Sequence, residues 1–230
     1  MNPTPANAPL QHQIPVLAHP PTLSAAFADP VWGPVPALTV GHFHARSSAH
    51  RPDVRVRVAA SATHLHFIWQ VSDRLVLSRV VEPNGSVCTD SCVEFFVAPL
   101  AGSGYFNLEI NAGGTVHCSY IEDPSIVDGG FAKMRFLPVG ELNRIAVRST
   151  LPAVVDPELP GPLIWELAVA VPLDVFAKEL GQPLSATGTW RGNFYKCADH
   201  SSGPHWASWS PIGERLAFHQ PSYFGYLRFS

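Results

Sequence analysis

Apolar and polar residues alternate over short stretches along most of this chain. Residues 54–58 read Val-Arg-Val-Arg-Val, so the valines face one side of an extended segment and the arginines face the other. The stretch 65–71 (LHFIWQV) is mostly apolar and predicts a more fully buried strand that ends at Ser72 and Asp73. A period of two residues is typical of β-strands.

Similar stretches recur between turn signals. We expect further strands at 92–97, 105–111, 115–120, 143–149, 164–171, 190–197 and 223–229. Connectors are predicted at Gly113-Gly114, Gly129-Gly130 and Pro160-Gly161-Pro162. A short helix is expected over 173–180, directly after a proline. Many short strands with one or two short helices predict an all-β fold, a β-sandwich of the jelly-roll or immunoglobulin-like kind.

The two ends of the chain differ in composition. Residues 1–20 are rich in Pro, Ala, Asn and Gln and predict an extended N-terminal arm. Residues 21–230 are expected to form a single domain, because β-sandwiches of this size commonly do.

Charge and hydropathy exclude several partners. The net charge is −3, only 14% of residues are charged, and no basic run occurs, which argues against nucleic acid or an anionic membrane as partner. No apolar run reaches the roughly 18 residues of a membrane span. The N-terminus lacks the features of a signal peptide, so export would require a leader that was removed. We expect a soluble monomer.

The four cysteines, Cys88, Cys92, Cys118 and Cys197, follow neither a zinc-ribbon nor a C-x-x-C spacing. Their favoured interpretation is reduced side chains that act as small apolar residues. A disulfide in an exported protein is the alternative, and the spacing does not set its pairing.

Polar residues gather on one face of three of the predicted strands. Asn107 and Glu109 share a face of 105–111, Glu94 shares its face of 92–97 with apolar neighbours, and Tyr195 lies on one face of 190–197. If these strands are neighbours, one surface carries carboxylates, an amide and a phenol, which suit vicinal hydroxyls. The alternative is an ordinary solvated face, although the carboxylate of Glu94 in so apolar a strand needs a partner.

Aromatic residues crowd the last forty positions without helical spacing. Trp209 is interpreted either as core or as the wall of a site, and Phe218 as an exposed ring that can stack on a ligand. His205 is interpreted as a surface residue or as a donor in the site. Trp69 and Trp165 alternate with apolar residues and predict core positions.

Seven segments, taken in order, resemble carbohydrate-binding module family 9 over residues 30–230. They are VSDRL from Val71, DSCVEFF from Asp90, YFNLEINAGGT from Tyr105, WELAVAVP from Trp165, NFYKC from Asn193, SWSP from Ser208 and FHQPSYFG from Phe218. The resemblance implies a β-sandwich related to DOMON-like domains, often with structural calcium. It also implies recognition of chain ends derived from xylan or cellulose by two tryptophans, a glutamate and other polar side chains.

Carried onto this sequence, the family glutamate falls on Glu94 and two further polar positions fall on Asn107 and Tyr195. The first clamp tryptophan falls near Cys88, which cannot stack on a sugar, and the second falls near Phe218, which can.

We therefore expect a bacterial, non-catalytic protein that binds plant-type or related β-linked glycans, in the context of polysaccharide catabolism. Its candidate binding residues are Glu94, Asn107, Glu109, Tyr195, Trp209 and Phe218. One alternative is a glycoside hydrolase that uses Glu94 and Glu109 as its carboxylate pair. Others are haem binding, for which Met134 is the only methionine besides Met1, and a protein-interaction role.

Overall fold

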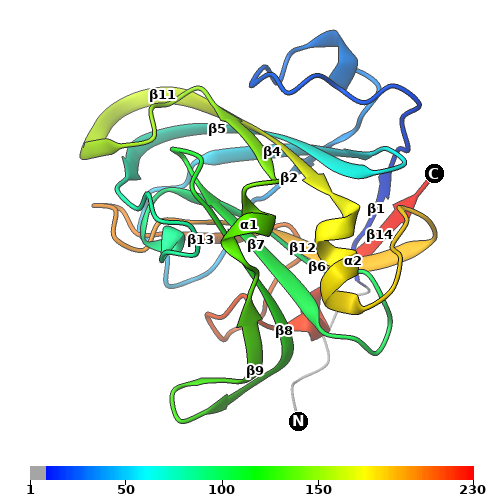
Figure 1. Ribbon diagram of the computed structural model, residues 1–230. Helices are drawn as coiled ribbons and strands as arrows, with labels where there is room; N and C mark the ends of the chain where they lie inside the picture. The colour runs from blue at the N-terminus through cyan, green and yellow to red at the C-terminus, as the bar shows by residue number, and fades with distance from the viewer. Residues whose placement is uncertain (1–8) are drawn as a thin grey trace.

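Two β-sheets packed on each other make up most of the computed structural model, which describes residues 9–230 (Figure 1). The nine-stranded sheet runs in the order β1 (Gln11–Ile14), β14 (Gly225–Phe229), β12 (Thr189–Cys197), β6 (Cys92–Ala98), β7 (Tyr105–Asn111), β8 (Val116–Val127), β9 (Gly130–Phe136), with β13 (Trp206–Ser208) beside β12 and β3 (His42–Phe43) beside β13. The five-stranded sheet runs in the order β10 (Ala146–Ser149), β11 (Val155–Pro172), β5 (His64–Ser78), β4 (Asp53–Ala60), β2 (Ala37–Thr39). The predicted all-β sandwich is confirmed.

Only two short α-helices accompany the sheets in the described part of the chain, α1 (Val139–Leu142) and α2 (Leu173–Leu180). The bounds of α2 are those predicted from the sequence. It ends at Gly181, whose left-handed backbone (φ 67°) closes the last turn. No helix in residues 9–230 is long and apolar enough to span a lipid bilayer.

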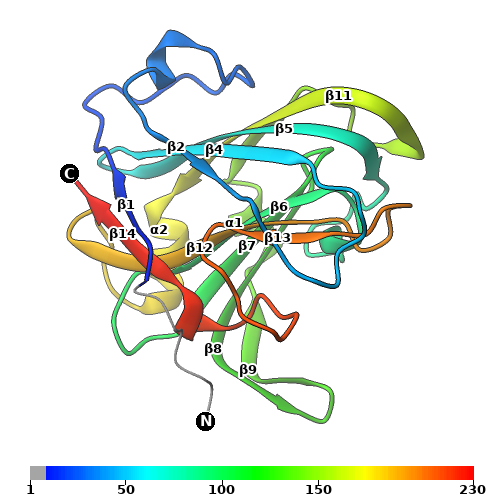
Figure 2. The same cartoon turned by 180° about the vertical axis from the view of Figure 1, so that it is seen from behind.

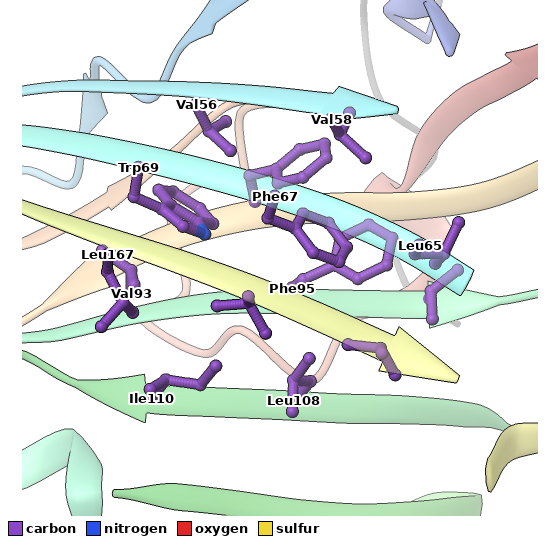
Figure 3. Packing of buried hydrophobic residues seen from close by; sticks show 14 of the residues in the cluster. Val56, Val58, Leu65, Phe67, Trp69, Val93, Phe95, Leu108, Ile110 and Leu167 are labelled. Atoms are coloured by element: carbon purple, nitrogen blue, oxygen red, sulfur yellow. The ribbon is translucent and has the colours of Figure 1, made fainter. Parts of the chain in front are cut away.

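The core lies between the two sheets (Figure 3). Val56, Phe67 and Trp69 extend from the five-stranded sheet toward Phe95 and Leu108 of the nine-stranded sheet. The ring centroids of Phe67 and Phe95 are 5.0 Å apart. The valines of β4 alternate with exposed or half-buried arginines, as the sequence pattern predicts. Trp69 and Trp165 are both buried, which confirms their predicted core positions.

The outer face of the nine-stranded sheet is also buried, which the alternating pattern did not predict. Almost every residue of β6 and β7 is buried on both faces. The reason is a second apolar cluster on the outer face, where Ile212 and Phe224 of the C-terminal segment pack on Phe96, Tyr105 and Tyr195. The polar face of these strands is therefore enclosed rather than solvated.

Several predicted strand bounds are wrong, and so is one predicted connector. β5 continues through Ser72 and Asp73 to Ser78, because the Asp73 carboxylate is buried and hydrogen-bonded within the fold. The prolines at 160 and 162 lie inside β11, which tolerates them through shifts of register against β5. The strand expected at 115–120 extends to Val127 and forms a hairpin with β9.

The expected N-terminal arm contains a strand of the sheet. Gln11–Ile14 pair in parallel with Tyr226–Phe229 of β14, and Ile14 is fully buried. Figure 2 shows β1 and β14 side by side at one edge of the molecule. The prediction of an arm over residues 1–20 is therefore wrong for 11–14, and its first eight residues lie outside the described part.

Candidate functional site

Strand pairing brings together the polar residues that the sequence placed on one face. Glu94 lies directly opposite Glu109 on β7 and opposite Tyr195 on β12, while Asn107 lies opposite Phe96. The three strands β12, β6 and β7 are consecutive neighbours in the sheet. The two carboxylates therefore point to the same outer face.

An open pocket of about 180 Å³ lies over this face. Its floor is formed by Glu94, Glu109 and Cys197, and its walls come from the turn after β12, from β13 and from the segment 216–219. The residues that line it are Cys88, Glu94, Phe96, Glu109, Cys197, Asp199, Trp206, Leu216, Ala217, Phe218 and His219. Pockets for drug-sized ligands usually measure about 300–1,000 Å³, so this one suits a smaller group.

Glu94 is the most unusual residue of the pocket. Its side chain is 2% exposed. One oxygen, Oε1, accepts a hydrogen bond from the Cys197 thiol at 3.0 Å, and the other, Oε2, has no partner. Burial, followed by the nearby charge of Glu109, raises the pKa of Glu94 well above its usual value. An unpartnered buried carboxyl oxygen is costly unless a ligand satisfies it.

Asn107 acts behind the pocket. Its side-chain amide donates to Oε1 of Glu109 at 2.7 Å, and its carbonyl oxygen accepts from the backbone N–H and the hydroxyl of Ser119. Burial raises the pKa of Glu109, and this hydrogen bond partly offsets the rise. Asn107 therefore orients Glu109 and does not line the pocket.

Two aromatic rings stand in the pocket wall. Phe218 is half-buried and lies stacked on Tyr195, with ring centroids 4.1 Å apart and planes 14° apart. Trp206, which the sequence analysis did not select, donates from its indole N–H to Asp199 at 2.8 Å. The position near Cys88 thus has no aromatic ring of its own, but Trp206 lies in the same wall.

Two of the predicted binding residues lie elsewhere. Trp209 is 6% exposed and packs in the core between the sheets, edge-on to Phe194. Tyr195 is fully buried beneath Phe218, and its hydroxyl donates to the carbonyl oxygen of Phe218 at 3.1 Å. Tyr195 therefore supports the pocket wall, whereas Trp209 belongs to the core.

Three residues that line the pocket were not selected from the sequence. Asp199, Trp206 and His219 lie in loops or at strand ends. In such segments an alternating pattern does not predict the direction in which a side chain points. His219 is half-buried, its Nδ1 lies 2.9 Å from the Tyr105 hydroxyl, and burial lowers its pKa to about 4. It is therefore neutral at pH 7.

A second buried polar cluster lies on the other face of β12. The Nζ of Lys196 contacts Nε2 of His205 at 2.9 Å and donates to the carbonyl oxygen of Cys197 at 2.8 Å. Asp73 accepts from Nε2 of His50 at 2.7 Å and from two backbone N–H groups. His205 is fully buried, so its predicted places at the surface or in the site are both wrong.

This second cluster borders a wider cleft of about 840 Å³ lined by His50, Asp73 and the 160–162 segment. Both oxygens of Asp73 already have partners, since Oδ2 also accepts a long bond from the Trp165 indole at 3.5 Å. The smaller pocket is the better candidate because its carboxylate is not satisfied within the protein.

Calcium requires six to eight oxygen ligands. Within residues 9–230, the only group of three acidic, histidine or cysteine side chains with converging ligand atoms is Cys92, Glu94 and Cys197. Two thiols do not fit a hard cation such as calcium. The structural calcium implied by the resemblance is not supported by this group.

Three comparisons place the chain among known proteins. A structure of a Bacteroides uniformis protein, whose carbohydrate binding is itself only proposed, matches with a TM-score of 0.83 and 27% identity over 97% of this chain and 100% of that one. A family 9 carbohydrate-binding module from Caldicellulosiruptor kristjanssonii in complex with glucose matches with a TM-score of 0.61 and 12% identity, over 95% and 96% of the two chains. A family 9 module from the same organism in complex with cellotriose matches with a TM-score of 0.62 and 13% identity, over 95% of this chain and 94% of that one.

No curated protein is significantly similar to the chain. The model of carbohydrate-binding family 9, in contrast, matches residues 34–229, which include every strand of the sandwich except β1. The chain belongs to carbohydrate-binding family 9.

Proposed function

We propose that the protein binds carbohydrate without cleaving it, and that the terminal unit of a β-linked glycan enters the pocket over Glu94. The observation that carries this proposal is the buried, unpartnered Oε2 of Glu94 beside two aromatic rings. A sugar ring offers hydroxyls for the carboxyl groups and an apolar face for Trp206 and Phe218. The small volume favours the end of a chain over an internal stretch.

Glucose and cellotriose are the first ligands to test, because structural neighbours of the same family are in complex with them. A xylo-oligosaccharide is the second, and a plant-type β-glycan as ligand would agree with a role in polysaccharide catabolism. We also expect the protein to act as a monomer.

Calorimetric titration with cellotriose tests the role of Glu94. Glu94→Gln should lower affinity by up to about tenfold, because the amide replaces a carboxyl oxygen that would bind a sugar hydroxyl, and one such hydrogen bond contributes roughly 0.5–1.5 kcal/mol. The matched control is Glu82→Gln, an exposed glutamate outside the pocket, which should bind as the unmodified protein does. Equal affinities of the Glu94 variant and the control would remove Glu94 from the binding site.

A glycoside hydrolase is the second candidate, because Glu94 and Glu109 lie directly opposite one another on adjacent strands. Retaining enzymes place two carboxyl groups about 5–5.5 Å apart on either side of the scissile bond. Here both side chains rise from the same face of one sheet, so they would contact a sugar from one side. Hydrolysis of chromogenic glycosides that disappears in Glu94→Gln would replace the binding proposal.

Haem binding is tested by the visible spectrum of the purified protein. Met134 lies in β9 rather than in a loop and is half-buried against the cluster that contains Tyr105 and Phe224. We expect no Soret band.

A further inference from the structure

We propose that Cys92, Cys197 and Glu94 form a binding site for a thiophilic divalent cation of the zinc or cadmium class at the base of the pocket. The site shares Glu94 with the proposed sugar site, but its chemistry differs and its test needs no sugar. It rests on the arrangement of three side chains and on one unsatisfied oxygen.

Strand register brings the three ligands together. Cys92 of β6 lies directly opposite Cys197 of β12, and Glu94 follows two residues later on the same face of β6. One ligand atom from each, two Sγ and one carboxyl oxygen, lie within 4.8 Å of one another. Around zinc, bonds of about 2.3 Å to sulfur and 2.0–2.2 Å to oxygen place ligand atoms roughly 3.5–3.8 Å apart. Small rotations of the three side chains would bring their ligand atoms from within 4.8 Å to the separations that zinc requires.

The site is rich in carboxyl groups, and one of them is incompletely hydrogen-bonded. Oε2 of Glu94 is buried without a partner, although the residue is only 2% exposed. Two further carboxyl groups, from Glu109 and Asp199, line the same pocket. A cation bound between the thiols would coordinate Glu94 and favour the ionised forms of these carboxyl groups.

The donor set selects the kind of cation. Two thiolates favour soft or borderline metals over calcium and magnesium. Both thiol protons, and the proton of Glu94 where that group is protonated, would pass to solvent on binding, so that the cation is held by two thiolates and one carboxylate. Three protein ligands leave a fourth position that faces the pocket, because Glu94 and Cys197 line it.

Cadmium titration of the full chain tests the proposal, since cadmium–thiolate bonds absorb in the near ultraviolet. The protein is first reduced, and its four thiols are counted as free. We expect one equivalent of Cd²⁺ to produce the thiolate band, a large excess of Zn²⁺ to reduce it, and excess Ca²⁺ to leave it unchanged.

Cys92→Ala and Cys197→Ala should each lose the band. Cys118→Ala is the matched control, because Cys118 is equally buried but lies in the core between the sheets, and it should keep the band. Should a cysteine variant fail to fold, Glu94→Gln provides the second test, with a weaker affinity expected. No thiolate band in the reduced protein, or a band that survives both cysteine changes, would overturn the proposal.

Discussion

Strand β12 carries a buried polar cluster on each face, and the two clusters differ in how well their charges are paired. On the face toward the other sheet, Lys196 contacts His205, and Asp73 of β5 contacts His50. On the outer face, Glu94 retains an oxygen without a partner. Both clusters are almost fully removed from solvent.

The acidic groups respond in opposite ways to these surroundings. Burial alone would raise the pKa of Asp73, but the charge of Lys196 and the hydrogen bond from His50 bring it below its usual value. Burial raises the pKa of Glu94 and of Glu109, and the charges of Lys196 near Glu94 and of His117 near Glu109 offset the rise only in part. A satisfied cluster stabilises the fold, whereas an unsatisfied one is available to a ligand.

The largest expected effect is on the inner cluster. Asp73→Ala should lower the free energy of unfolding by about 3–5 kcal/mol, because it leaves a buried cation without its counter-charge. Chemical denaturation measures the loss. Asp53→Ala is the control, since Asp53 pairs with Arg55 at the surface and should change stability by less than about 1 kcal/mol. Similar losses of unfolding free energy in the two variants would show that the Asp73 carboxylate contributes no more to stability than a surface ion pair does.

A smaller effect is expected from the pH dependence of the outer cluster. Burial raises the folded-state pKa of Glu109 above the ordinary value of 4.5, so the folded protein holds a proton that the unfolded chain releases. This contribution to stability is complete below pH 4.5 and is lost as pH rises through the folded pKa.

Glu109→Gln, which can keep the bond from Asn107, should therefore flatten the decline in stability above pH 4.5. The difference in slope is at most about 1.4 kcal/mol per pH unit for one proton. Denaturation in the presence of a chelator, at a series of pH values, gives the two profiles. Parallel profiles would mean that Glu109 is ionised in the folded protein.

The smallest expected effect is that of Phe218, which should change the affinity for sugar but not the stability of the fold. Phe218→Ala should weaken cellotriose binding by up to about tenfold, because stacking on an aromatic ring contributes roughly 0.5–1.5 kcal/mol. Phe136→Ala removes an exposed ring from β9 and serves as the control. Unchanged binding after loss of Phe218 would show that this ring does not stack on the sugar.

The same comparison explains which predictions from sequence succeeded. Glu94, Asn107 and Glu109 were assigned to one face correctly, because alternation along a strand is a local property. Trp209 and Trp206 were not distinguished, since the course of the chain after β12 sends one ring into the core and the other to the pocket. Asp73 was read as a strand end because its partner, His50, is 23 residues away.

The sequence by itself determined most of the longer strands, the helix at 173–180, the two faces of β4, β6 and β7 and the sandwich class, because these follow from local periodicity and turn chemistry. It did not predict β1, β2, β3, β9 or β13. Only the tertiary structure decided that segment 212–224 covers the outer face, that Cys92 lies opposite Cys197, and that Glu94 is left with a free oxygen. Those features depend on the pairing and covering of segments about a hundred residues apart, which local pattern does not specify.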